Sequence, residues 1–245
     1  MSKLRFFLCT VIVLLVFIPN VVTAQSYKVV VGDIPGMEPL MKMITTMGDE
    51  MNVKIEIIIV PMPRMIYMLE SKQADIGAPM LALRNKDKIN KLTYDYSTDR
   101  TGGGVCFVLY TNKSKPIDVE SLKNGNPNNY KIESDATNVN LFDFNTLPST
   151  NVEGSLRKVD AGRIDGYIMG QIGADPVLKS LNLKNVKRQF FETYETVFAL
   201  PKGSKGSDVD KFISDALKKI KNSKQLYNAF IAPAKQSTVY VDWQP

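Results

Sequence analysis

Two stretches of this sequence repeat one pattern 90 residues apart, and this repeat constrains the fold more than any other feature. Residues 69–80 are LESKQADIGAPM, and residues 159–170 are VDAGRIDGYIMG. Each contains a helix end, a short polar break, an Asp beside a small residue, and an apolar run that indicates a strand. A chain that uses this helix–turn–Asp–strand unit twice is expected to form two similar lobes, with the functional site between them.

The aspartates of the two copies are Asp75 and Asp165. An aspartate in a short polar break is typical of a turn in which the carboxylate bonds to its own backbone. We expect that structural role for both residues, and contact with a ligand is the alternative.

Strands and helices alternate around the first copy. Apolar runs predict strands at 27–35, 53–60 and 74–80, and apolar spacings of three and four predict helices at 37–51 and 63–71. Strand–helix–strand order implies parallel strands joined by right-handed crossovers. The expected fold class is therefore α/β, with two lobes that are each a mostly parallel sheet flanked by helices.

Later segments divide the chain between the lobes. Glycines 102–104 allow the backbone to turn or to approach a ligand closely, and the strand after them leads out of the first lobe. Two strand-like pieces lie within 185–203, and the second of them, 196–200, returns to the first lobe. The expected first lobe is 25–108 with 196–245, and the expected second lobe is 109–195.

The C-terminal part begins with an amphipathic helix predicted over 207–231. The tail after it holds the only tryptophan, Trp243. We expect this tail to pack on the protein surface, as a lid or a strap on the first lobe.

The first 24 residues predict a cleaved signal peptide. Lys3 and Arg5 precede an apolar run at 6–18, and Val22-Thr23-Ala24 supplies the small residues of a cleavage site. The apolar run is shorter than the ~20 residues of a spanning helix, which disfavours the alternative of a membrane anchor. We expect a periplasmic protein that begins near Gln25.

Composition excludes several kinds of site. The chain has no histidine, which removes Ser-His and Cys-His nucleophile pairs and His-rich metal sites. Cys106 is the only cysteine after residue 24, and it lies in an apolar run that predicts an inert, buried thiol. Basic residues are spread among 25 acidic ones, so no nucleic-acid partner is expected. We expect no cofactor and no metal.

The order of these pieces resembles a known family, the solute-binding proteins of amino-acid ABC transporters (solute-binding family 3). The resemblance spans nearly the whole mature chain. It depends on YKVVVGD, LESKQADIGAPM, YDYS, DAGRIDGYIMG and YETVFALPKGS in that order. It implies a type 2 periplasmic binding fold, in which two crossover strands join the lobes and a small molecule binds in the cleft. It also implies a monomer that delivers its ligand to an inner-membrane ABC permease.

The charged side chains that bind the α-carboxylate and the α-ammonium group of an amino acid in this family are missing or displaced in this chain. In this family, an Arg shortly after the strand that contains ADI makes a bidentate contact with the ligand's α-carboxylate. This chain has Arg84 and Lys86 near that position. Arg and Lys are not equivalent in such recognition. The family's acidic residue for the α-ammonium group corresponds to Gly170. Cations without the matching acid predict an organic anion or an oxyanion as the ligand.

Other residues are expected near the cleft because open α/β sheets bind ligands at the carboxyl ends of their strands. Thr137 and Asn138 lie at a predicted helix N-terminus, which favours an anionic group. For each candidate except Arg64, a surface or turn role is an equal alternative. The candidate ligand-binding residues are Asp33, Arg64, Met80, Arg84, Lys86, Tyr94, Tyr96, Thr137, Asn138, Gly170 and Tyr194.

Three classes of function remain open. An exported receptor that captures a small polar molecule, anionic or zwitterionic, for an ABC permease is the leading hypothesis, and we expect no enzyme activity. A dehydratase-like or lyase-like enzyme on the same scaffold is the first alternative, in which Asp33 or Glu195 would serve as acid or base. A sensory ligand-binding protein is the second, although a sensor usually has a downstream membrane span and we expect none after the final tail.

Overall fold

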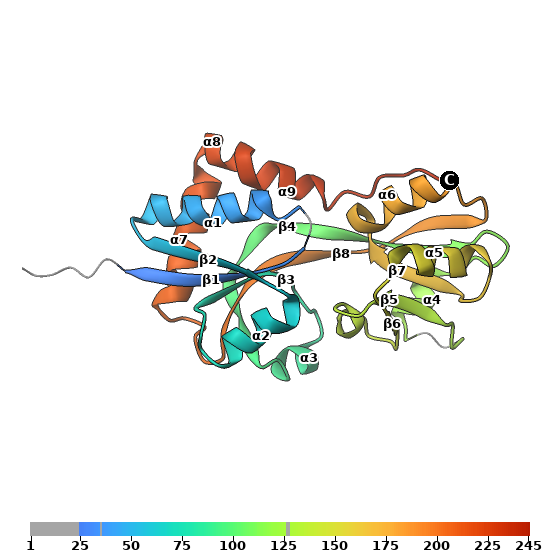
Figure 1. The fold of residues 1–245 in the computed structure, drawn as a ribbon, viewed down its shortest axis with the longest axis horizontal. Coiled ribbons are helices and arrows are strands. Elements are labelled where there is room, and N and C mark those ends of the chain that lie inside the picture. The colour runs from blue at the N-terminus through green and yellow to red at the C-terminus, as the bar shows by residue number, and fades with distance from the viewer. Residues whose placement is uncertain (1–24, 35, 126–127) are drawn as a thin grey trace, which may run out of the picture.

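The computed structural model describes residues 25–34, 36–125 and 128–245. The predicted signal peptide lies outside these residues. In Figure 1 the chain forms two halves, and two long strands run from one half to the other. No helix of the described part is long and apolar enough to cross a membrane.

The first lobe has the predicted alternation of strands and helices. Its strand β1 pairs in parallel with both β2 and β3. Because β1 is central and covered on both faces, its valines 29–31 are fully buried. The elements are β1 (Ser26–Gly32), α1 (Glu38–Met51), β2 (Lys54–Val60), α2 (Met62–Glu70), β3 (Ile76–Leu81) and α3 (Lys86–Asn90).

The second lobe repeats this arrangement on a smaller scale. Its central strand β5 pairs in parallel with β6 and β7. Helices α5 and α6 cover the sheet, as Figure 1 shows. The elements are α4 (Val119–Lys123), β5 (Ile132–Asp135), the short 3-10 helix η2 (Val139–Leu141), β6 (Leu147–Ser149), α5 (Val152–Asp160), β7 (Gly166–Gly170) and α6 (Gln171–Leu181).

Two long antiparallel strands, β4 (Tyr94–Asn112) and β8 (Val186–Pro201), belong to both lobes. They join all strands into one sheet of order β2-β1-β3-β8-β4-β7-β5-β6. The prediction of two separate strand pieces within 185–203 was wrong, because β8 is continuous. Glycines 102–104 also lie inside β4, where the pairing with β8 shifts register, and they do not form a turn between elements.

Asp75 and Asp165 have the same structural role in the two lobes. The Asp75 carboxylate accepts a hydrogen bond from the Lys28 N–H at 2.8 Å, and the Lys28 carbonyl accepts one from the Asp75 N–H. Asp165 makes the same reciprocal pair with Lys131, with 2.7 Å to the carboxylate. Each aspartate therefore ties the start of its strand to the neighbouring parallel strand, and not to its own turn as we expected.

The C-terminal region is divided where a single helix was predicted. Helix α7 (Asp208–Asn222) ends at Ser223, and a short α8 (Lys224–Leu226), a π-helical η3 (Tyr227–Ile231) and α9 (Ala232–Gln236) follow. Residues 237–245 then leave the first lobe and lie against α6 and β8 of the second lobe (Figure 1). This placement differs from the expected packing of the tail on the first lobe.

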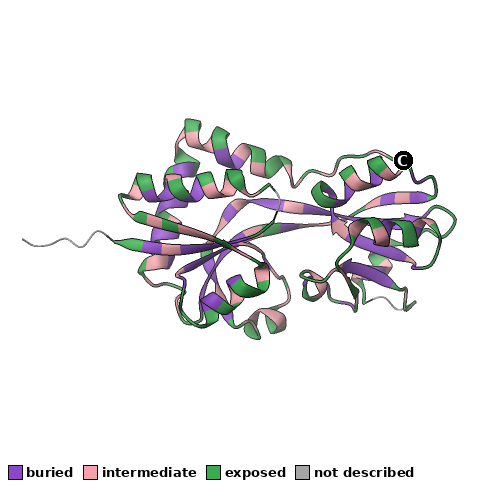
Figure 2. Ribbon diagram, viewed as in Figure 1, coloured by how far each residue is buried: buried purple, intermediate pink, exposed green. Residues whose placement is uncertain are grey.

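The buried apolar residues of the described chain form four clusters, two in each lobe. In the first lobe, one cluster packs β1 and β3 against α1 and α7, and the other packs the opposite sheet face against α2. In the second lobe, one cluster centres on Phe107 and Phe142, and the other packs β4 and β7 against α5 and α6. Figure 2 shows this burial along the strands of both lobes.

Candidate functional site

The two lobes touch each other at one side of the β4–β8 crossing. The Asn85 side-chain amide, which precedes α3, donates to Asp143 Oδ1 of the second lobe at 3.1 Å. Lys88 Nζ lies 3.3 Å from the same oxygen and 3.2 Å from the Asn140 carbonyl, and it also donates to the Phe142 carbonyl. These contacts form a bridge between α3 and residues 140–143, which we call the interlobe latch.

Arg84 lies beside this latch and already has an acidic partner. Its Nη1 is 3.1 Å from the Glu192 carboxylate, and its Nη2 donates to the Thr193 carbonyl at 2.9 Å. The guanidinium also lies 5.6 Å from the ring centre of Tyr194. The structure thus brings together two predicted residues, Arg84 and Tyr194. However, the Glu192 carboxylate already pairs with Nη1 of the Arg84 guanidinium.

The predicted tyrosines are packed into the lobes. Tyr194 is buried against Phe107, with ring centres 5.2 Å apart, and burial raises the pKa of its hydroxyl. Tyr94 and Tyr96 are buried in the first lobe with their ring centres 5.9 Å apart. The Tyr96 hydroxyl donates to the Leu81 carbonyl at 3.1 Å and accepts from the Leu83 N–H at 3.3 Å. Tyr96 therefore fixes the loop that leads to Arg84.

Two predicted cations lack an acidic partner within 4 Å among the described residues. Arg64 is exposed in the first turn of α2, with its guanidinium 4.9 Å from the ring centre of Tyr67. Lys86 is exposed at the first residue of α3, two residues before the latch residue Lys88. Asp33, directly after β1, is also exposed. Met80 is half-buried in β3, opposite Val197 of β8.

Thr137 and Asn138 follow β5 in a turn that is already closed by a carboxylate. The Asp135 side chain accepts hydrogen bonds from the N–H of Thr137 at 2.9 Å and from its hydroxyl. The following helix, η2, has only three residues. Asp135 therefore takes both Thr137 donors with its carboxylate, and its backbone carbonyl accepts the Asn138 N–H at 2.8 Å.

Gly170 ends β7, where a side chain has no room. A Cβ atom there would lie 2.7 Å from Val105 Cγ1. Gln171, the next residue, uses its side-chain amide to bond the backbone of Val239 and Val241 in the tail. The position that is acidic in the family thus has a packing role in this chain.

Sequence reasoning missed the acidic half of the interlobe latch. Lys88 lies two residues after the predicted Lys86, but Asp143 is 55 residues away in the second lobe and carries no local signal. Asn85 was missed as well, although an Asn directly before a short helix is a recognisable N-cap. Its side chain both caps α3 and contacts Asp143.

Two surface hollows lie away from the crossing. One, of about 500 Å³, is lined by α5 and neighbouring residues, including Arg157, Lys158 and Arg163. The other, of about 240 Å³, lies at the beginning of β1 and β2 and includes Lys54 and Asp75. In residues 25–34, 36–125 and 128–245, no group of three His, Cys, Asp or Glu side chains is arranged to hold a metal ion.

No protein-family model matches the chain, and no curated protein matches it. Solved structures do resemble it. One is a histidine kinase sensor domain with similarity to periplasmic binding proteins, at TM-score 0.59 and 13% identity, covering 84% of this chain and 94% of that chain. Another is the probable amino-acid ABC transporter extracellular-binding protein YtmK from Bacillus subtilis, at TM-score 0.56 and 14% identity, covering 85% and 99%.

A third similar structure is an ancestral amino-acid-binding protein described as a precursor of cyclohexadienyl dehydratase. Its TM-score is 0.56 at 16% identity, and the match covers 84% of this chain and 95% of that chain. Each of the three likenesses covers 84–85% of this chain and therefore extends over both lobes. The chain therefore has the two-lobed fold of the type 2 periplasmic binding proteins.

Proposed function

We propose that this protein is a solute receptor of the periplasm, which captures a small anionic molecule between its lobes and presents it to an ABC permease. In this proposal, the protein acts as a monomer after cleavage of residues 1–24. The ligand enters when the lobes separate about the β4–β8 crossing and is enclosed when they return.

The observation that carries the proposal is that some cations of the first lobe and of β4 have acidic partners and others do not. Three are neutralised internally, because Arg84 pairs with Glu192, Lys88 with Asp143, and Arg100 with Glu195. Arg64 and Lys86 remain without acidic partners in the described part of the chain. Two unpaired cations on the first lobe favour a ligand with one or two anionic groups, such as a small dicarboxylate or an oxyanion.

A free amino acid fits this arrangement less well. Its ammonium group needs a carboxylate or several carbonyl oxygens, and the position that supplies the carboxylate in the family is Gly170 here. The carboxylates of Glu192 and Asp143 are already paired. An ammonium group that used either of these carboxylates would have to compete with an existing ion pair, which leaves the exposed Asp33 as its candidate partner.

The interlobe latch explains how closure would depend on the ligand. The latch side chains are partly exposed, so the one ion pair of the latch, Lys88–Asp143, contributes only about 0–1 kcal/mol. A closed form held by such weak contacts can open readily, and a ligand that touches both lobes would shift the population toward closure.

A sensory role is the second candidate, because one similar structure is a histidine kinase sensor domain. The capture of the ligand would be the same, and the partner would be a signalling region instead of a permease. An enzyme role is less well supported. Glu195 is exposed and paired with Arg100, so it lies in water rather than in a desolvated site.

Isothermal titration tests the ligand class directly. The panel contains malonate, succinate, citrate, phosphate and sulfate, together with alanine, glutamate and lysine. We expect one of the anions to bind, and the variants Arg64→Met and Lys86→Met each to weaken that binding about tenfold or more, which corresponds to 1.4 kcal/mol.

The matched control is Arg163→Met, which removes an exposed arginine of the second lobe away from the crossing. It should leave the affinity unchanged. Tight binding of alanine or lysine that survives both cleft substitutions would contradict the anionic class. Crosslinking to a permease or to a membrane sensor in cells then separates the transport role from the sensory role.

A further inference from the structure

Residues 237–245, which we call the strap, connect the two lobes along the outside of the crossing. The strap begins directly after α9. Helix α9 in turn follows Phe230 and Ile231, which are buried in the core of the first lobe. It ends against α6 and β8 of the second lobe. The chain thus passes between the lobes a third time, in addition to β4 and β8.

At the crossing, the C-terminal segment lies in a slot made by the three glycines of β4. A Cβ atom on Gly103 would lie 2.7 Å from Ala234 Cβ, and one on Gly104 would lie 3.0 Å from Thr238 Cγ2. Ser237 donates its hydroxyl to the Gly104 carbonyl, and its own carbonyl accepts the Cys106 N–H at 3.1 Å. The glycines therefore leave room for the close approach of η3, α9, the beginning of the strap and the β8 backbone rather than of a ligand.

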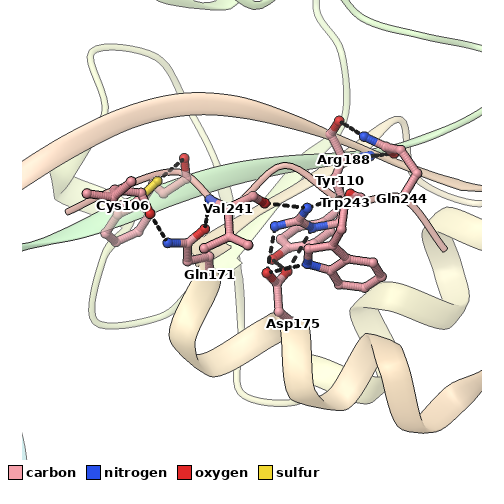
Figure 3. A network of polar contacts seen from close by, with 10 residues as sticks. Cys106, Tyr110, Gln171, Asp175, Arg188, Val241, Trp243 and Gln244 are labelled. Carbon is pink, nitrogen blue, oxygen red and sulfur yellow. Dashed lines mark hydrogen bonds and ion pairs between the residues drawn. The ribbon is translucent and has the colours of Figure 1, made fainter. Parts of the chain in front are cut away.

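At the second lobe, the strap ends on a buried ion pair. Arg188 donates to the carbonyls of Val241 and Trp243 at 3.0 and 2.6 Å, and the Trp243 indole N–H donates to Asp175 at 3.0 Å. The Gln244 side chain exchanges two hydrogen bonds with the backbone of Arg188. Figure 3 shows how Arg188 and Asp175 meet the strap.

Between these two attachments the strap is short. Gln171 at the start of α6 holds Val239 and Val241, and Val239 is only five residues after Ala234. Five residues span at most about 17 Å when fully extended. Helix α9 of the first lobe and the start of α6 in the second lobe therefore cannot move far apart unless one set of contacts breaks.

We propose that the strap limits how far the lobes separate and so sets the fraction of the protein in the open form. This inference deepens the proposed function, because it concerns the motion that admits the ligand. A strap that restricts opening disfavours widely separated lobes, so less free energy is needed to bring the lobes together around a ligand, and the apparent affinity rises.

Spin labels test the inference without any ligand. Glu70→Cys in the first lobe and Lys184→Cys in the second introduce two exposed labelling sites, and the native Cys106 is fully buried. Pulsed electron spin resonance then gives the distribution of distances between the lobes. We expect a narrow distribution in the labelled parent and a wider one, shifted to longer distances, after truncation at Gln236.

A milder variant covers the case in which the truncated chain does not fold. Gln171→Ala removes the two bonds that the start of α6 makes with Val239 and Val241, and it leaves the contacts of Arg188 and Asp175 with the strap in place. It should widen the distribution in the same direction. The matched control is Asp242→Ala, because Asp242 is an exposed strap residue, and this change should leave the distribution as in the parent.

Unchanged distributions in both the truncated and the Gln171→Ala proteins would overturn the inference, as would equal widening by Asp242→Ala. Because no ligand is present, these results do not depend on whether an anion binds. Failure to bind any anion would contradict the proposed function and leave the distance measurement valid.

Discussion

The guanidinium of Arg188 and the carboxylate of Asp175 form a two-point ion pair, with Nη2 2.6 Å from Oδ2 and Nε 2.9 Å from Oδ1. The Arg188 side chain is completely buried. The Tyr110 hydroxyl donates to the same carboxylate at 2.7 Å. The guanidinium carbon of Arg188 lies 4.4 Å from the ring centre of Trp243. One buried charge pair thus joins β4, α6, β8 and the strap.

Removal of the acidic partner should be strongly destabilising. Asp175→Ala leaves the Arg188 charge buried without a counter-charge, and we expect the free energy of unfolding to fall by about 3–5 kcal/mol. Urea denaturation followed by the fluorescence of Trp243, the only tryptophan, measures this loss. The matched control, Glu153→Ala, breaks the exposed pair with Arg157 and should cost no more than about 0.5 kcal/mol. Equal losses for the two variants would contradict a special role for the buried pair.

The interlobe latch should affect the lobe distance more than stability. Asp143→Ala removes the acceptor for Asn85 and Lys88, both of which lie in the first lobe. Because the pair is partly exposed, we expect the free energy of unfolding to change by less than about 1 kcal/mol. Small-angle scattering should show a larger radius of gyration than in the parent. Glu120→Ala, which breaks a pair with Lys123 inside the second lobe, should leave the radius unchanged.

The sequence predicts the elements of each lobe well, because those elements pack by local rules. The alternation of β1, α1, β2, α2 and β3 follows from apolar periodicity, and the two copies of the Asp-containing unit do begin equivalent strands. Apolar periodicity does not predict the strand where β8 passes from one lobe to the other. Residues 192–195 of β8 are polar or aromatic and lie between the two lobes, so a continuous strand has no continuous apolar pattern there.

The candidate site was only partly predictable for a related reason. Arg84 was found from its position after the ADI strand, but its partner Glu192 is 108 residues later, and only the pairing of β3 with β8 brings the two together. The glycines of β4 gave a correct signal of close approach. The approaching groups include α9 and the beginning of the strap, which no local pattern near residue 103 reveals.

Cys106 should be unreactive in the folded protein. Its side chain is fully buried in β4, and burial raises the pKa of the thiol to about 11. At pH 8, only about one thiol in a thousand is then the reactive thiolate. We expect no reaction with Ellman's reagent under native conditions and one equivalent of reaction in urea. Rapid native reaction would mean that β4 is exposed, which is incompatible with the spin-labelling scheme.

The final prediction concerns acid stability and the beginning of α7. Asp210 is 1% exposed and accepts hydrogen bonds from the Thr98 hydroxyl at 2.6 Å, the Thr98 N–H at 2.8 Å and the Gly206 N–H at 2.8 Å. Burial alone opposes ionisation, but the hydrogen bonds outweigh it and lower the pKa of the carboxyl below its usual value. Asp210 thereby joins α7 to β4 in its charged form.

A carboxyl whose pKa is lower in the folded state stabilises the protein fully above its unfolded pKa of about 3.9. That contribution is lost as the pH falls below 3.9 through the folded-state pKa, because the unfolded chain then binds a proton that the folded chain does not.

We expect the free energy of unfolding of the parent to fall more steeply below pH 4 than that of Asp210→Asn, by up to about 1.4 kcal/mol per pH unit. Urea titrations from pH 6 to pH 3 measure both slopes. Asp215→Asn, which changes an exposed carboxylate of the same helix, is the matched control and should keep the slope of the parent. Identical slopes for the parent and Asp210→Asn would show that Asp210 does not carry this acid sensitivity.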